Sequence, residues 1–158
     1  MQCNYISIFS LIIRAFTNWS LFVYILLHVT NIKINKGVHL AVKLFVLTSS
    51  IVGIYVVQFY KTKWDKYYNI DKNCLSYFDM FIHVFPLIYI LLFDNTCLKL
   101  KRNELIYFIY YTLAYTMIYV SVINPKHVYH VVPLSYVTLI SIPTCTYLML
   151  TGVYMYLC

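Results

Sequence analysis

The chain has 158 residues, of which 62% are hydrophobic and 11% are charged, and its mean hydropathy is +0.74. A typical soluble domain has about 25% charged residues, so a chain this apolar has too little polar surface to cover a soluble globule. The formal net charge is +7, but the lysines and arginines fall between apolar runs, which suits lipid headgroups and not a nucleic-acid-binding face. The composition predicts one integral membrane domain over residues 1–158, with membrane lipids as partners and no nucleic acid.

The first apolar stretch, residues 5–30, contains Arg14 near its middle, and a central arginine costs about 2.5–3.5 kcal/mol on insertion scales. Polar residues recur on one helical face of this stretch at steps of three and four: Ser7, Ser10, Arg14 and Asn18. The stretch is either one long tilted helix or an amphipathic helix in the interface, residues 5–13, followed by a span from about 15 to 32. The polar face favours the second arrangement.

Four later runs have the ~20 mostly apolar residues that a membrane-spanning helix needs. They cover residues 39–60, 75–93, 104–123 and 131–158. Because lipid offers the backbone no hydrogen-bond partners, each run should be helical. We therefore expect an all-helical transmembrane bundle of about five spans plus an N-terminal interfacial amphipathic helix.

The connections between these spans are short: residues 33–38, 61–73, 94–103 and 124–130. Asn35 and Gly37 predict a helix stop in the first of them. With this count, the first and third connections and the C-terminus lie on the same side. The basic residues divide evenly between the two sides, with Lys33, Lys36, Lys99, Lys101 and Arg102 against Lys61, Lys63, Lys66, Lys72 and Lys126. The excess of positive charge that normally marks the cytoplasmic side therefore leaves the orientation, and the identity of the membrane, open.

Asp79 and His83 are the ionisable pair that the pattern places inside a span. They are four residues apart, on the same helical face as Ser76. Ionisable residues within spans are functional hypotheses by default, and a carboxylate one turn from an imidazole can fix its tautomer and raise its basicity. Pro86, one turn further on, should kink the helix. The pair is therefore either a catalytic base with its orienting acid or a polar contact that fixes the packing of the bundle.

A nucleophile for this pair would have to come from another span. The candidate hydroxyls are Thr48, Ser49, Ser50, Thr112, Thr116, Ser135, Thr138, Ser141 and Thr144. Most intramembrane serines and threonines bond to their own helix or pack between helices, and Ser49 with Gly53 has the small-xxx-small spacing of a packing contact. The pattern therefore favours packing roles for these hydroxyls.

The remaining polar groups predict no cofactor and no metal. His28 and His39 lie near helix ends, where an interfacial position suits them, and Lys43 is close enough to a span's start to extend its ammonium to the headgroups. His127 and His130 bracket a turn but lack further ligands. The cysteines contain no CxxC pair, and we expect free thiols at Cys3, Cys74, Cys97, Cys145 and Cys158.

Several short motifs resemble the androgen-induced-gene and rolling-stone group of multipass membrane proteins. They are FTNWSLF at 16–22, LAV at 40–42, KWDKYY at 63–68, HVFP at 83–86 and VYH at 128–130. The resemblance implies a helical membrane fold, usually of six spans. Its androgen-induced members use an intramembrane threonine and histidine to hydrolyse fatty-acid esters, which implies a fatty-acyl ligand and a catalytic role for His83. The threonine would fall near Val23, which has no hydroxyl, and rolling-stone relatives also lack an evident threonine.

Two functions remain as hypotheses. The first is a non-catalytic interaction or assembly protein of the membrane, in which Asp79 and His83 lock the bundle. The second is an intramembrane lipid hydrolase, in which His83 is the general base and Asp79 orients it. The missing hydroxyl at Val23 favours the first.

Overall fold

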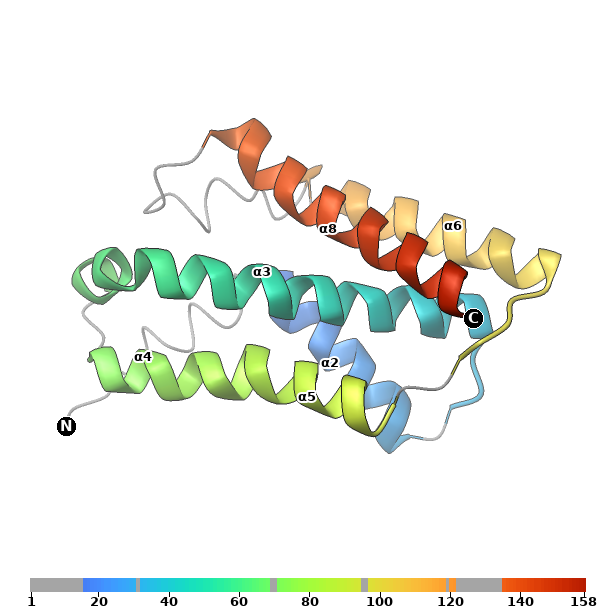
Figure 1. The fold of residues 1–158 in the computed structure, drawn as a ribbon, viewed down its shortest axis with the longest axis horizontal. Helices are drawn as coiled ribbons and strands as arrows, with labels where there is room; N and C mark the ends of the chain where they lie inside the picture. Colours follow the sequence, from blue (N-terminus) through green and yellow to red (C-terminus); the bar gives the residue numbers. More distant parts are fainter. Residues whose placement is uncertain (1–15, 31, 69–70, 95–96, 119, 122–134) are drawn as a thin grey trace.

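A computed structural model describes residues 16–30, 32–68, 71–94, 97–118, 120–121 and 135–158 (Figure 1). Every element in these ranges is helical, which confirms the predicted all-α class. The elements are α2 (Phe16–Val29), α3 (Lys36–Tyr68), α4 (Lys72–Asp79), η1 (Met80–Val84), α5 (Phe85–Leu92), α6 (Arg102–Ile118) and α8 (Tyr136–Leu157). The interfacial helix predicted over residues 5–13 lies outside the described ranges.

Helix α3 is the centre of the bundle. The rod formed by α4, η1 and α5 runs along one side of it, α6 and α8 lie on another side, and α2 packs across it (Figure 1). All residues from 40 to 50 are buried, as expected for a helix that is apolar all round. Of the apolar window of α3, 72% is buried, against 11% for that of α8. The core is therefore built around α3, whereas α8 leaves most of its apolar surface exposed.

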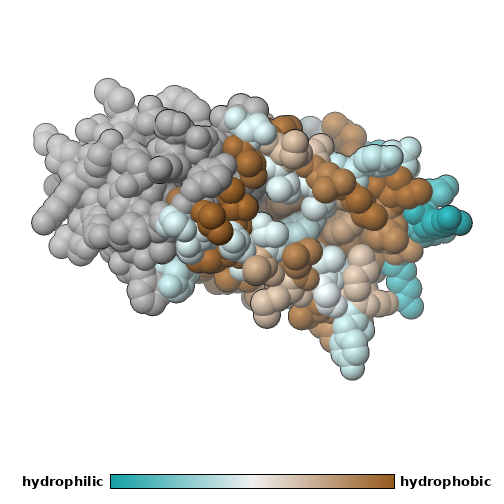
Figure 2. All heavy atoms as spheres, turned by 90° about the horizontal axis from the view of Figure 1, so that it is seen from above, coloured by the Kyte–Doolittle hydropathy of each residue, from teal (hydrophilic) through white to brown (hydrophobic). Residues whose placement is uncertain are grey.

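Within the described ranges, three helices are long and apolar enough to cross a membrane: Lys36–Val57, Asn73–Leu92 and Val137–Leu157. Helices α2 and α6 have 14 and 17 residues, or about 21 and 26 Å at 1.5 Å per residue, against a hydrocarbon core of about 30 Å. The described part of the chain thus supports three of the five predicted spans by length and composition. In Figure 2 hydrophobic side chains recur across the visible surface, and the most hydrophilic atoms gather at the end where α3 and α6 begin.

The boundaries of α3 differ from the prediction at both ends. The helix begins at Lys36, because the Asn35 side chain accepts a hydrogen bond from the Gly37 backbone N–H at 2.9 Å and so caps a helix start. Gly37 lies inside the first turn, where a Cβ would collide with the backbone carbonyl of Glu104 at the start of α6. At the other end the helix continues through residues 61–68, for which the sequence pattern predicts a loop. No glycine or proline interrupts that stretch, and its residues tolerate a helix.

A single π turn joins α4 and α5. The Phe85 backbone N–H bonds to the Met80 carbonyl five residues earlier, which inserts one extra residue into the helical ladder just before Pro86. Proline has no backbone N–H and cannot donate a hydrogen bond. The π turn accommodates this missing donor within the helix. The predicted kink is therefore replaced by a register shift within one continuous rod (Figure 1).

A disulfide between Cys97 and Cys158 ties the connection after α5 to the end of α8. Their Cα atoms are 5.4 Å apart, within the usual range for disulfides. Cys74, at the opposite end of the α4–α5 rod, is also disulfide-bonded, whereas Cys145 is free and exposed. The expectation of free thiols is wrong for these three, because spacing in the sequence carries no record of which cysteines the fold brings together. Since both ends of the rod carry disulfide-bonded cysteines, the disulfides do not assign one end to an oxidising compartment.

Candidate functional site

Asp79 and His83 form a buried hydrogen-bonded pair, as their spacing predicts. The distance from His83 Nδ1 to Asp79 Oδ1 is 2.8 Å, and the two residues are 7% and 3% exposed. An ionised carboxylate can only accept hydrogen bonds, so Nδ1 carries the proton and donates it. In a neutral ring, Nε2 would then be the basic atom. His83 lies in the π turn, which helps to set the direction of its side chain.

The His83 imidazole packs directly against Gly53 on α3. A Cβ built on Gly53 would collide with ring atoms of His83, including Nε2. The small-xxx-small spacing of Ser49 and Gly53 therefore marks a close contact, as predicted, and its partner is this imidazole. Among the described residues, Asp79 is the only hydrogen-bond partner of His83. The atom that would act as a base faces helix backbone.

Three of the candidate hydroxyls form hydrogen bonds with groups other than His83. Ser49 donates to the Val46 carbonyl of its own helix at 2.9 Å. On α6, Thr112 bonds to the Tyr147 hydroxyl on α8 at 2.8 Å, and Thr116 donates to the Thr112 carbonyl at 2.8 Å. These contacts are the packing roles that such residues usually have in membrane helices. None of the hydrogen bonds within the described ranges joins His83 to a hydroxyl.

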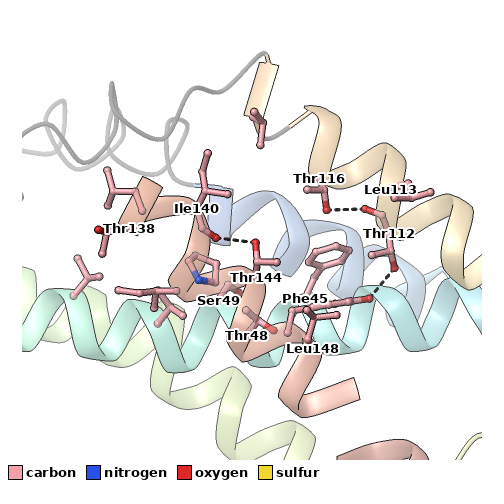
Figure 3. A pocket seen from close by; sticks show the side chains of 17 residues that line it. Phe45, Thr48, Ser49, Thr112, Leu113, Thr116, Thr138, Ile140, Thr144 and Leu148 are labelled. Carbon is pink, nitrogen blue, oxygen red and sulfur yellow. Dashed lines mark hydrogen bonds between the residues drawn. The ribbon is translucent and has the colours of Figure 1, made fainter. Parts of the chain in front are cut away.

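A cavity of about 270 Å³ lies between α3, α6 and α8 (Figure 3). Aliphatic and aromatic side chains make up most of its wall, with several hydroxyls among them. The lining residues labelled in Figure 3 are Phe45, Thr48, Ser49, Thr112, Leu113, Thr116, Thr138, Ile140, Thr144 and Leu148. Neither Asp79 nor His83 lines it. Its volume is close to the lower end of the ~300–1,000 Å³ range of small-molecule sites.

Thr48 is the exception among the hydroxyls of this cavity. It is 4% exposed, and its Oγ1 is the one buried side-chain N or O atom without a hydrogen-bond partner in the described part of the chain. By contrast, Thr116 and Thr144 each donate to the carbonyl four residues earlier (Figure 3). A buried polar atom left without a partner costs about 1–3 kcal/mol. The wall of this apolar cavity therefore contains a threonine whose hydroxyl has no hydrogen-bond partner.

A second polar cluster lies near the start of α3. The Lys43 ammonium lies 3.3 Å from Asp94 Oδ1 and also donates to the Asp94 backbone carbonyl. The Tyr24 hydroxyl donates to Asp94 Oδ2 at 2.5 Å, and His28 Nε2 lies 3.9 Å from the same oxygen. Lys43 is 3% exposed, so the expectation that it extends to the headgroups is wrong. The partner that keeps it buried follows α5, far along the chain.

No family model, no curated protein and no solved structure matches this chain. These comparisons therefore neither support nor oppose the resemblance that the short motifs suggest. Any function proposed for the chain therefore rests on the geometry of its own residues.

Sequence reasoning found the Asp79–His83 pair because its spacing is local. It did not find the cavity or the Asp94 cluster. The cavity depends on how α3, α6 and α8 pack, and the cluster joins residues of α2 and α3 with Asp94, which follows α5. Lys43 is the sequence feature that points to the Asp94 cluster. It lies seven residues inside a long apolar helix, where a lysine needs either a route to water or a carboxylate.

Proposed function

We propose that this chain is a multi-pass integral membrane protein that binds an apolar, long-chain molecule without chemically changing it. The proposal rests on Thr48, whose buried hydroxyl has no hydrogen-bond partner and which lies in the wall of a mostly apolar cavity. A ligand with an apolar body and one hydroxyl or carbonyl would fill the cavity and satisfy that hydroxyl.

The depth of Thr48 narrows the ligand class. It lies about 18 Å along α3 from Lys36 at 1.5 Å per residue, near the middle of the 22-residue apolar window Lys36–Val57. In a membrane that depth is far from the phospholipid headgroups. The ligand is therefore a single-chain lipid, such as a long-chain alcohol, that lies wholly within the hydrocarbon region.

The position of the Asp79–His83 pair supports binding over hydrolysis. Neither residue lines the cavity, and neither does Gly53, the α3 residue that contacts His83. An acyl ester in the cavity would therefore be bound by other side chains than the Asp79–His83 pair. A general base needs its target within about 2.6–3.2 Å or one water molecule. A hydrolase that uses His83 is thus the weaker alternative.

The proposal predicts that a photoreactive long-chain alcohol labels the cavity in a way that depends on Thr48. The full-length protein is reconstituted into phosphatidylcholine vesicles and labelled with the alcohol or with a matched photoreactive alkane. We expect Thr48→Val to reduce labelling of α6 and α8 peptides by the alcohol about 2- to 10-fold, the worth of one hydrogen bond, and to leave labelling by the alkane unchanged. Leu148→Trp, which fills the cavity, should reduce both.

The matched control is Thr146→Val, because Thr146 bonds to the Ile142 carbonyl at 2.9 Å and does not line the cavity. It should label as the wild type does. Equal labelling of all variants by both probes would contradict the proposal. In that case the probes would be reporting the lipid-facing surface alone.

A further inference from the structure

Three side chains from separate parts of the chain converge beside the start of α3. His28 is on the last turn of α2, His39 is on α3 and Asp94 follows α5, and their ligand atoms all lie within 4.8 Å of one another. Two imidazoles and one carboxylate are the ligand set of many Zn²⁺ sites that keep one coordination position open. We propose that His28, His39 and Asp94 bind a divalent transition-metal ion, with Zn²⁺ the best match.

The tautomer of His28 supports this proposal. Its Nδ1 lies 3.0 Å from the Tyr24 backbone carbonyl oxygen. A carbonyl can only accept, so Nδ1 carries the proton and the neutral ring presents the lone pair of Nε2. Histidines that bind metals usually donate their other ring N–H in this way. The arrangement fixes the ring before any ion arrives.

The Asp94 carboxylate supplies an electron-rich oxygen close to His28 Nε2. Asp94 Oδ2 lies 3.9 Å away, and a carboxylate oxygen opposite an imidazole lone pair favours a cation between them. The Tyr24 hydroxyl donates to the same carboxylate oxygen, which holds the group in place as a second-sphere contact would.

Lys43 should weaken the binding of a metal ion at this site. Its ammonium is 3.3 Å from Asp94 Oδ1, and its positive charge repels a second cation at the same carboxylate. The site should therefore bind metal more weakly than an isolated set of the same ligands. Removing this charge while keeping the length of the side chain should strengthen binding.

The cluster is open on one side. A cavity of about 310 Å³ adjoins it, lined by Leu27, His28, Ile32, Lys33, Ile34, Lys36 and His39. The cavity gives an ion a route in and leaves space for a water molecule at the remaining coordination position. An occupied site would join the end of α2, the start of α3 and the segment after α5, so bound metal should raise the melting temperature.

The test is titration of the purified full-length protein in micelles with Zn²⁺ by calorimetry and with Co²⁺ by visible absorption. We expect one ion per chain, a tetrahedral Co²⁺ spectrum and a metal-dependent rise in melting temperature. His39→Ala should weaken binding by at least about 10-fold, and Lys43→Met should strengthen it. Lys33→Ala, which changes the cavity wall but no ligand, should bind as the wild type does.

Each variant is first melted without metal to show that it is folded. His28→Ala is the second ligand variant, since His28 is the most exposed of the three and its loss is the least disruptive. Unchanged affinity in both histidine variants would overturn the proposal, and so would the absence of saturable binding to the wild type. Either result would leave the cluster as an ion-pair network around Asp94.

Discussion

Gly37→Ala should lower the stability of the protein by about 1–3 kcal/mol, the usual cost of overpacking. A Cβ at this position would collide with the backbone carbonyl of Glu104, and backbone cannot move aside as a flexible side chain can. The first turns of α3 and α6 would have to separate. Thermal or denaturant unfolding in micelles measures the loss.

Gly152→Ala is the matched control, because a Cβ there meets no atom within 4 Å. In α8 this substitution should stabilise the helix by about 0.5–1 kcal/mol, since alanine has less backbone freedom to lose. If the two substitutions change the stability in opposite directions, the result supports the close contact between α3 and α6. Equal melting temperatures would show that the two helices are not packed this closely.

Asp79→Leu should destabilise the protein by about 1–3 kcal/mol, because it leaves the buried His83 N–H without its acceptor. Asp79→Asn keeps an amide oxygen that can accept from Nδ1 and should lose less. The predicted order of melting temperatures is wild type, then Asp79→Asn, then Asp79→Leu. If Asp79→Leu melted above the wild type, the pair would face lipid and would not hold α4 and α5 against α3.

The parts of the fold that can be predicted from the sequence are those set by local pattern. Apolar runs of about 20 residues predict the helices, and a spacing of four residues predicts the contact between Asp79 and His83. Helix ends are harder to predict. The pattern predicts a helix stop at Asn35, yet its side chain caps the start of α3. Asparagine can cap either end of a helix, and here its partner, the Gly37 N–H, shows which end it is.

The parts that cannot be predicted in this way are those set by packing between distant segments. Gly37 lies inside a helix because α6 approaches it closely, and Lys43 stays buried because Asp94 lies opposite. Cys97 and Cys158 pair across a separation of 61 residues. The residue that each of them contacts lies far away in the chain, so the local sequence does not identify the contact.

The central claim is that the acid–base pair is structural and that the cavity binds without catalysis. In the fold the pair is not part of the cavity: His83 packs against Gly53, and neither Asp79 nor His83 lines the cavity. A hydrolase would need them together. A membrane protein that holds a single-chain lipid needs only the cavity and a rigid core behind it, which the Asp79–His83 contact helps to supply.

Reaction of the purified full-length protein with a fluorophosphonate probe tests this claim most directly, because the probe labels hydroxyls activated by a neighbouring base. We predict that the wild type remains unlabelled in micelles in which an added serine hydrolase labels fully. Labelling of the wild type that is lost in a folded His83→Gln variant would contradict the claim. It would show that His83 activates a hydroxyl and that the protein is an enzyme.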